Sequence, residues 1–480
     1  MDPLLAFDKA LGNAVERLVR SHHHRRLRGL GWEHALEPDD GGLWVAGDPP
    51  PRDGNAVEIL IDGAEALPRM AAELRNAKSH VHIAGWHVSP WFELERDGGT
   101  TEVRTLLEEL AERVDVRLLL WAGSPLPLFR PARDDVDGAR HALAFGSRIQ
   151  VALDAKERPM HCHHEKIVVV DDRVAFVGGI DLTTLAGDRF DTSAHRARGT
   201  VGWHDAAAAV RGPLVRDVAE HFRLRWHDVA EEELPEPKAS RRAGDATLQF
   251  VRTVPERVYD ALPRGEFRIV EAYTRAFRSA QRLIYLENQF FWSSELAEIL
   301  QEKLAHPPSD DFRLVVVLPT NPNNGGDDTR GQLADLIDCD GGAGRVIACT
   351  LTALGDQGPC PVYVHAKIGI VDDRWLTLGS ANLNEHSMFN DTEVNLVCCD
   401  PSLARATRLR LWSEHLEQPL QAVDRAAAAV VDELWRPIAR EQRRLRDAGE
   451  PQTHRLSELP HVSRRTGRLR GPMQGLLVDG

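Results

Sequence analysis

The sequence is poor in cysteine. Six of its 480 residues are cysteines, and they lack the paired spacing of a zinc site: Cys162, Cys339, Cys349, Cys360, Cys398 and Cys399. A small scaffold held by disulfides carries cysteine at a much higher density. We therefore exclude a disulfide framework and expect reduced thiols, as in a cytosolic protein.

Long apolar runs and an excess of positive charge are also absent. No stretch approaches the ~20 consecutive apolar residues that span a bilayer, and the amino end lacks the charged-then-apolar order of a signal peptide. The net charge is −14 and the sequence pI is about 5.8, so no global basic field attracts nucleic acid. These features predict a cytoplasmic protein with at most peripheral contact with a membrane surface, and they disfavour nucleic acid as a partner.

One motif, His-x-Lys-x-x-x-x-Asp, is present twice. The first copy runs from His164 to Asp171, and the second begins 201 residues later and runs from His365 to Asp372. In both copies an apolar run separates the Lys from the Asp, and small residues follow at the same distance, Gly178-Gly179 and Gly379-Ser380. The sequence therefore predicts a duplicated hairpin.

Residues two apart on a strand share a face, so each copy presents its His and its Lys together. When two copies meet, two imidazoles and two ammonium groups surround one cavity. Such a cavity suits a phosphodiester: the cations hold the phosphate oxygens, one histidine attacks phosphorus, and the other protonates the departing alcohol. The motif pair therefore indicates phosphoryl-transfer chemistry.

Strands and helices alternate in both halves in one order. Apolar alternation predicts strands at 57–61, 81–86, 116–121 and 149–153 before the first motif, and at 283–289, 313–318 and 346–349 before the second. Helices are predicted at 64–77, 101–113 and 266–280. The predicted fold class is α/β, a duplicated α-β-α sandwich with two repeats about a pseudo-twofold axis and the active site at their interface.

A chain of this length exceeds the size at which a single core stops growing. We predict an N-terminal extension and linker at 1–54, a first repeat at 55–235, a second repeat at 236–435 and a basic C-terminal tail at 436–480. The histidine-rich run at 21–26 is interpreted as a solvated basic turn after a short helix. The arginines of the tail are interpreted as solvated rather than as a site for anionic lipid headgroups.

Further segments flank both motifs. Gly178 to Leu182 and Trp203-His204-Asp205 follow the first, and Tyr285 to Gln289 precedes the second. With the two motifs, these segments resemble the phospholipase D superfamily, in particular its bacterial phospholipase D-like and cardiolipin synthase-like group, over most of residues 55–435. The resemblance implies a phospholipase D-like fold in each repeat and a reaction through a covalent phosphohistidine.

The resemblance also implies roles for individual residues. Those assigned to catalysis are the motif residues His164, Lys166, Asp171, His365, Lys367 and Asp372, with attack by His164, proton donation by His365, and the two aspartates stabilising the hairpins. Those assigned to phosphate or substrate binding are Gly179, Asp181, Ser380 and Asn382, with Asp181 in place of the family's frequent Asn. Asp191 and Glu393, 27 and 28 residues after the motif histidines, match acidic residues that orient such histidines.

A catalytic metal is the alternative that the histidine-rich first motif raises. His161, His163 and His164 with Asp171 and Asp172 include ordinary zinc ligands. Neighbours on a strand point to opposite faces, and the adjacent lysines repel a cation. We therefore expect no cofactor and no catalytic metal.

The predicted function is a phospholipase D-type phosphodiesterase or transphosphatidylase that acts on glycerophospholipids. One alternative is a nuclease of the same superfamily, and the non-enzyme alternative is a catalytically silent lipid-binding scaffold, which would require a broken motif. Neither copy is broken. We expect a monomer in which the two repeats form an intramolecular pseudo-dimer.

Overall fold

The apolar β-branched runs of the first half form one sheet. The computed structural model describes residues 3–39, 41–96, 100–125, 130–158, 161–322, 326–355 and 358–459. The strands of the first sheet lie in the order β1 (Arg52–Ile61), β10 (Ala206–Arg211), β8 (Val174–Gly178), β7 (Ile167–Val170), β2 (His80–Gly85), β5 (Asp115–Trp121) and β6 (Gln150–Asp154). Within this sheet only the neighbouring pairs β2–β5 and β5–β6 are parallel, as expected for strands joined by helical crossovers.

The second sheet repeats this order strand for strand. It runs β11 (Ala246–Val254), β20 (Glu393–Cys398), β19 (Trp375–Gly379), β18 (Ile368–Val371), β13 (Leu283–Glu287), β14 (Arg313–Val317) and β15 (Val346–Ala353). The short strand β12 (Glu266–Phe267) pairs with β11, and β1 also pairs with β11, which joins the two sheets. The duplicated α/β fold predicted from the sequence is confirmed.

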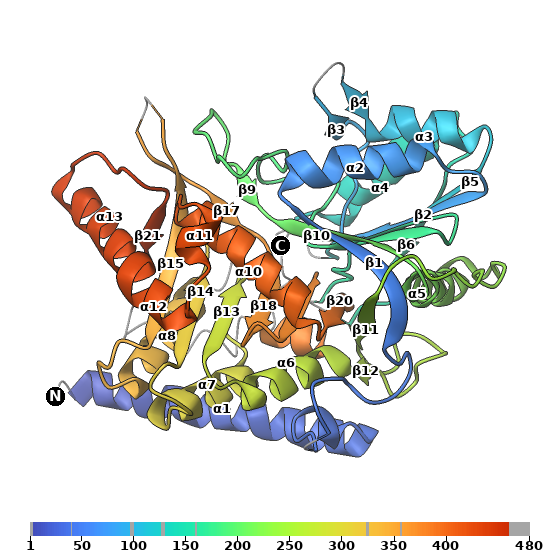
Figure 1. Cartoon of the computed structure of the whole chain (residues 1–480). Helices are drawn as coiled ribbons and strands as arrows, with labels where there is room; N and C mark the ends of the chain where they lie inside the picture. Colours follow the sequence, from blue (N-terminus) through green and yellow to red (C-terminus); the bar gives the residue numbers. More distant parts are fainter. Residues whose placement is uncertain are drawn as a thin grey trace.

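Helices cover both faces of each sheet (Figure 1). In the first half, α2 (Gly63–Arg75), α3 (Val103–Ala111) and α4 (Arg133–Ala144) lie on the outer face and α5 (Leu214–Ala230) on the inner face. In the second half, the outer helices are α6 (Arg268–Ser279), α7 (Ser294–Ala305) and α8 (Gly326–Cys339), and α10 (Pro401–His415) lies on the inner face. The short helices are η1 (Glu33–Ala35), α9 (Glu385–Phe389), α11 (Leu420–Val423), α12 (Ala427–Val430) and the π-helical η2 (Val431–Trp435).

The two halves share one hydrophobic core. Along β7, Val168 packs with the outer helices of the first half, while Val169 joins an inner cluster, because successive strand residues face opposite sides. That inner cluster contains Phe222 of α5 together with Ile370 and Trp412 of the second half. The repeats are therefore packed face to face, which brings the two motifs to their interface.

Each motif aspartate lies at the turn of its hairpin. Asp171 and Asp172 both have positive φ, 58° and 52°, which is the left-handed conformation that a tight two-residue turn requires and that Asp tolerates. The Asp171 carboxylate accepts hydrogen bonds from the backbone N–H groups of Lys78, Ser79 and His80, at 2.7–3.1 Å. Asp372 does the same for residues 281–283. These aspartates therefore fix the start of β2 and β13, at the opposite end of the hairpin strands from the histidines.

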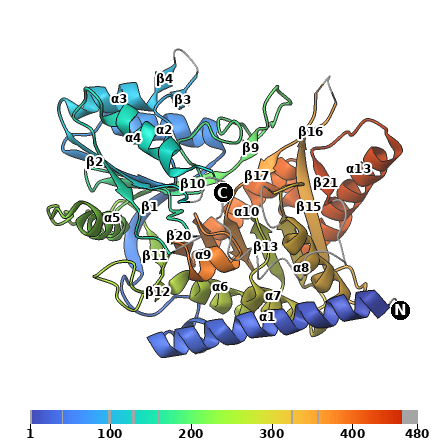
Figure 2. The same ribbon diagram turned by 180° about the vertical axis from the view of Figure 1, so that it is seen from behind.

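The amino-terminal extension is a long helix that packs on the second half. Helix α1 (Pro3–Leu30) runs along α6 and α7 in both views (Figures 1 and 2). The interpretation of residues 21–26 as a solvated turn was wrong, because the helix continues through them and buries His23 and Leu27. His23 Nδ1 lies 2.7 Å from Glu295 Oε1 and 3.3 Å from Glu385 Oε2.

This contact predicts a pH dependence of stability. Burial raises the pKa of Glu295 to about 7, and burial followed by repulsion from Glu295 raises that of Glu385 to about 7. Between the ordinary carboxyl pKa and pH 7 the folded protein holds protons that the unfolded chain releases, so these groups weaken the fold as pH rises through that window. Glu385→Gln should therefore gain stability relative to the parent at pH 8 and not at pH 4.

Denaturant midpoints of parent and variant at both pH values measure this effect. Subtracting the parent at each pH removes the contributions of titrating groups that do not interact with Glu385. A stability difference between variant and parent that is equal at pH 4 and pH 8 would contradict the expected titration of Glu385.

The carboxyl-terminal boundary differs from the prediction. Helix α13 (Arg436–Ala448) is followed by β21 (Leu456–Glu458), which pairs with β15 and extends the second sheet. Residues 436–459 thus belong to the second half rather than to a tail. The predicted basic tail arginines at 464, 465, 468 and 470 lie outside the described residues. Within the part of the chain that the structure describes, no helix combines the length and apolar character needed to cross a membrane.

Candidate active site

Each motif histidine stands just before a strand and is held there by the opposite half. His164 N–H donates to Thr392 O at 2.9 Å, and His365 N–H donates to His204 O at 2.7 Å. Beside these bonds, His163 forms a parallel bridge to Thr392, and the short strand β17 (Tyr363–Val364) pairs in parallel with β9 (Trp203–His204). The two halves therefore position each other's histidines.

The imidazoles face each other with their ring centroids 6.4 Å apart. Nδ1 of His164 lies 3.0 Å from Glu393 Oε1, and Nδ1 of His365 lies 2.7 Å from Asp205 Oδ2. Both carboxylates come from the half opposite to the histidine they hold. Because Nδ1 is engaged in both rings, the nitrogen that can react with a substrate is Nε2.

The motif lysines lie next to the histidines and are almost fully buried. Each ammonium donates to the carbonyl of its own motif histidine. Lys166 Nζ also lies 3.3 Å from Asp181 Oδ2, and Lys367 Nζ lies 3.4 Å from Gln289 Oε1. The site therefore concentrates two cations around the paired rings.

Burial and charge shift the pKa values of the site. Burial, followed by repulsion from Lys367 and Lys166, holds the pKa of His365 well below its ordinary value. Burial raises the pKa of Asp205 to about 6 despite the attraction of Lys367, and that of Glu393 to about 8 despite the attraction of Lys166. A positive potential at His365 favours an anionic ligand such as a phosphodiester.

The structure corrects the orienting residue predicted for the first half. Asp191 contacts His195, at 3.1 Å, and not a motif histidine. The counterpart of Glu393 is Asp205, because Asp205 directly precedes β10 and Glu393 is the first residue of β20, the equivalent strand of the second half. The segment from Gly179 to Asp205 spans 26 positions and that from Ser380 to Glu393 spans 13, so equal spacing after the histidines selected the wrong residue. An acidic residue directly before the final apolar strand was the signal that would have identified Asp205.

Gly179 and Ser380 also differ from their predicted role. Their N–H groups donate to strand carbonyls, Ala206 O and Val394 O, both at 2.9 Å, so neither is available to a phosphate. The Ser380 hydroxyl donates to Glu393, and a Cβ on Gly179 would lie 2.2 Å from Asp205 Oδ1. Both residues support the carboxylates that hold the histidines.

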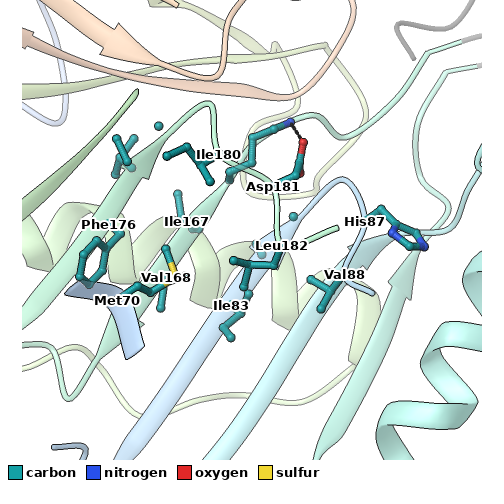
Figure 3. A pocket seen from close by; sticks show the side chains of 16 residues that line it. Met70, Ile83, His87, Val88, Ile167, Val168, Phe176, Ile180, Asp181 and Leu182 are labelled. Atoms are coloured by element: carbon teal, nitrogen blue, oxygen red, sulfur yellow. Dashed lines mark ion pairs between the residues drawn. The ribbon is translucent and has the colours of Figure 1, made fainter. Parts of the chain in front are cut away.

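Asp181 and Asn382 occupy equivalent positions, two residues after these small residues, and both are buried. Asp181 lines an apolar pocket of the first half that reaches Lys166, with Ile83, Val168 and Phe176 among its walls (Figure 3). Figure 3 also shows the ion pair of Asp181 as a dashed line. The first half therefore places an acid beside its lysine where the second half has Asn382.

The residues considered for a catalytic metal are separated in the structure. His163 Nε2 lies 3.0 Å from Asp154, His161 Nδ1 lies 3.0 Å from His386, and His164 faces Glu393. Asp171 lies at the far end of β7, where its carboxylate accepts hydrogen bonds from backbone N–H groups. These groups do not converge on one point.

Comparison with known proteins agrees with this arrangement. Residues 273–413 match the family model described as cardiolipin synthase, PLD-like domain. The chain is 26% identical to phospholipase D A of Dictyostelium discoideum over 464 residues, which cover 76% of this chain and 36% of that protein. It is 23% identical to cardiolipin synthase 1 of Staphylococcus aureus (strain COL) over 431 residues, covering 85% of this chain and 74% of that protein.

A solved structure shares the fold. The phosphatidylserine synthase of Haemophilus influenzae Rd KW20 superimposes with a TM-score of 0.50 at 14% identity, covering 79% of this chain and 89% of that chain. This chain spans little more than a third of the length of the Dictyostelium relative. The repeated motif, the repeated sheet and these relatives lead to one conclusion, that the chain belongs to the phospholipase D superfamily.

Proposed function

We propose that this protein is a phosphodiesterase of the phospholipase D type, which transfers the phosphatidyl group of a glycerophospholipid to water or to another alcohol. The observation that carries this proposal is the pairing of His164 with His365, each held at Nδ1 by a carboxylate of the opposite half. Two oriented imidazoles at one interface supply a nucleophile and a proton donor to the same phosphate.

The reaction divides into two displacements. His164 Nε2 attacks phosphorus, so that an N–P bond forms while the P–O bond to the headgroup breaks, and the leaving oxygen takes a proton from His365 Nε2. Water or an alcohol then attacks phosphorus and gives its proton to His365, and the N–P bond breaks. The assignment of attack to His164 follows the family resemblance.

The lysines and the low pKa of His365 fit this sequence. Lys166 and Lys367 stabilise the charge that develops on the phosphate oxygens. They also disfavour the imidazolium form of His365 in the unloaded site. The negative charge of a bound phosphodiester offsets the positive charge of the lysines and raises the pKa of His365. His365 can then hold the proton that it must donate.

A phospholipid is the proposed substrate. The two curated relatives are named a phospholipase D and a cardiolipin synthase, both of which refer to phospholipid chemistry. The chain carries a net charge of −14, whereas a nuclease neutralises a polyanionic backbone with lysine and arginine. We propose that the protein acts as a cytoplasmic monomer that reaches the lipid surface by peripheral contact.

Transfer to an added alcohol tests the proposal. The purified chain is incubated with mixed phospholipid vesicles and a primary alcohol, and phosphatidyl alcohol is measured by mass spectrometry. We expect this product, because a phosphohistidine persists until a nucleophile reaches it. A tertiary alcohol at equal concentration is the control, since its hindered hydroxyl competes poorly with water.

Single-stranded DNA and RNA are assayed in parallel at low and high salt. Cleavage of nucleic acid that requires His164 and falls steeply with salt, with every phospholipid left intact, would replace the lipid proposal with the nuclease alternative.

A further inference from the structure

Four ionisable side chains meet in a buried space between the halves. They are Asp62 at the end of β1, His195 in the loop before β9, His204 in β9, and Glu414 in α10 of the second half. One nitrogen or oxygen atom of each lies within 4.8 Å of the corresponding atoms of the other three. Asp62, His195 and His204 are at most 1% exposed, so these groups meet out of contact with bulk water.

Apart from the hydrogen bond between His204 Nδ1 and Asp62 Oδ1, the contacts in this cluster are longer than ordinary hydrogen bonds. His195 Nε2 lies 3.8 Å from Asp62 Oδ2 and 3.4 Å from Glu414 Oε1. These three atoms are buried and make no hydrogen bond within the described part of the chain. Leaving buried polar atoms unpaired is costly, so a partner for them is expected in the space they enclose.

The same separations match the coordination sphere of a metal ion. Ligands 2.0–2.2 Å from a tetrahedral zinc ion lie about 3.3–3.6 Å from one another. Of the distances in the cluster, 3.4 Å between His195 Nε2 and Glu414 Oε1 falls inside that range. The 3.8 Å distances from His195 Nε2 to Asp62 Oδ2 and from His204 Nδ1 to Glu414 Oε1 lie slightly above it. His204 Nδ1 also lies 3.0 Å from Asp62 Oδ1, which leaves Asp62 Oδ2 as the ligand oxygen.

Both histidines are held on the side away from this space. His195 Nδ1 lies 3.1 Å from Asp191 Oδ2, and His204 Nε2 lies 2.8 Å from Glu287 Oε2. A carboxylate behind each imidazole is the arrangement that orients metal-binding histidines and raises their basicity. Gly202 makes room for it, because a Cβ there would lie 2.1 Å from Asp191 Oδ2.

We propose that Asp62, His195, His204 and Glu414 bind a divalent transition-metal ion of the zinc type, in a structural site that joins the two halves. Both histidines would have to release a proton when the ion binds, after which the two carboxylates balance the charge of a dication. This ligand set suits zinc or its first-row neighbours. The longer first-half loop supplies His195.

The proposed ion does not touch the reacting atoms but lies directly behind them. The His204 carbonyl accepts from His365 N–H, and Asp62 Oδ1 accepts from Asp205 N–H at 3.1 Å. The site would therefore fix the backbone that carries both His365 and the carboxylate that orients it. His195 and Glu414 act as positioning residues for the active site, and Glu414 ties the second half to the first.

Metal content of the full chain, purified without a histidine tag, tests the proposal. We expect close to one equivalent of a first-row metal by inductively coupled plasma mass spectrometry. Replacement by Co²⁺ should give the intense visible absorption bands of a tetrahedral ion, a readout that needs no variant and no activity.

Variants of the proposed ligands test whether the ion binds in this cluster. His195→Gln and Glu414→Gln should each lower the metal content to well under half an equivalent and remove the cobalt bands. His80→Gln is the matched control, because His80 also faces a carboxylate, Asp172 at 3.1 Å, outside the cluster, and it should keep the full equivalent. A folded parent protein that contains no metal and takes up neither Zn²⁺ nor Co²⁺ would overturn the proposal, as would cobalt bands that persist in both cluster variants.

Discussion

Asparagine in place of either His164 or His365 should reduce phosphatidyl transfer by about 10⁴-fold or more without unfolding the protein. Asparagine can still place an amide near Glu393 or Asp205, but it can neither attack phosphorus nor donate a proton from an imidazolium. Turnover is measured as release of the headgroup, and the thermal unfolding midpoint of each variant shows that the fold is kept.

The two variants should differ in whether they accumulate the covalent phosphohistidine intermediate. With a phospholipid labelled at phosphorus, His365→Asn keeps the nucleophile and should accumulate labelled protein, whereas His164→Asn should not. Slow leaving-group departure in His365→Asn is overcome by using a substrate with a good leaving group. Label on His164→Asn alone would reverse the assignment of nucleophile and acid, and label on neither variant would contradict a covalent intermediate at these residues.

Loss of an orienting carboxylate should have the second largest effect. Asp205→Asn replaces the carboxylate that lies 2.7 Å from His365 Nδ1 with a neutral amide, and Glu393→Gln does the same for the carboxylate 3.0 Å from His164 Nδ1. Each amide permits the tautomer or ring orientation that is unsuited to reaction, so we expect kcat to fall by roughly 10²- to 10⁴-fold with a much smaller change in KM.

Two control variants distinguish the loss of histidine orientation from a general disturbance of the fold. Asp172→Asn removes another Asp–His pair of the first half, with His80, away from the paired rings, and should leave kcat within a few-fold of the parent. Asp191→Asn tests the residue that sequence spacing favoured, and a loss of kcat there larger than in Asp205→Asn would contradict the assignment made from the structure.

The sequence by itself determined the repeat and the motif residues that we propose to react. The spacing from His164 to Asp171 recurs from His365 to Asp372, and hairpin geometry is local, so the motif predicts the Asp turns and the position of each lysine next to its histidine. The sequence also predicts many of the strands and helices in their order along the chain, because apolar alternation and helical spacing are properties of short segments.

Only the tertiary structure decided which residues hold the histidines. Glu393 and Asp205 each act on the histidine of the opposite half, and no spacing along the chain encodes a contact across an interface. The longer first-half loop moved the matching acid from the expected position of Asp191 to Asp205. Gly179 and Ser380 were likewise assigned to the phosphate, although their N–H groups are used by neighbouring strands.

The same limit applies to α1 and to the buried cluster. A helix with His23 on one face looks solvated until Glu295 and Glu385 of the second half are placed against it. Asp62, His195, His204 and Glu414 lie up to 352 positions apart in the chain, and they become one site only when the two sheets pack face to face. Local sequence patterns specify the elements and the chemistry each can offer, whereas long-range packing decides which of those groups meet.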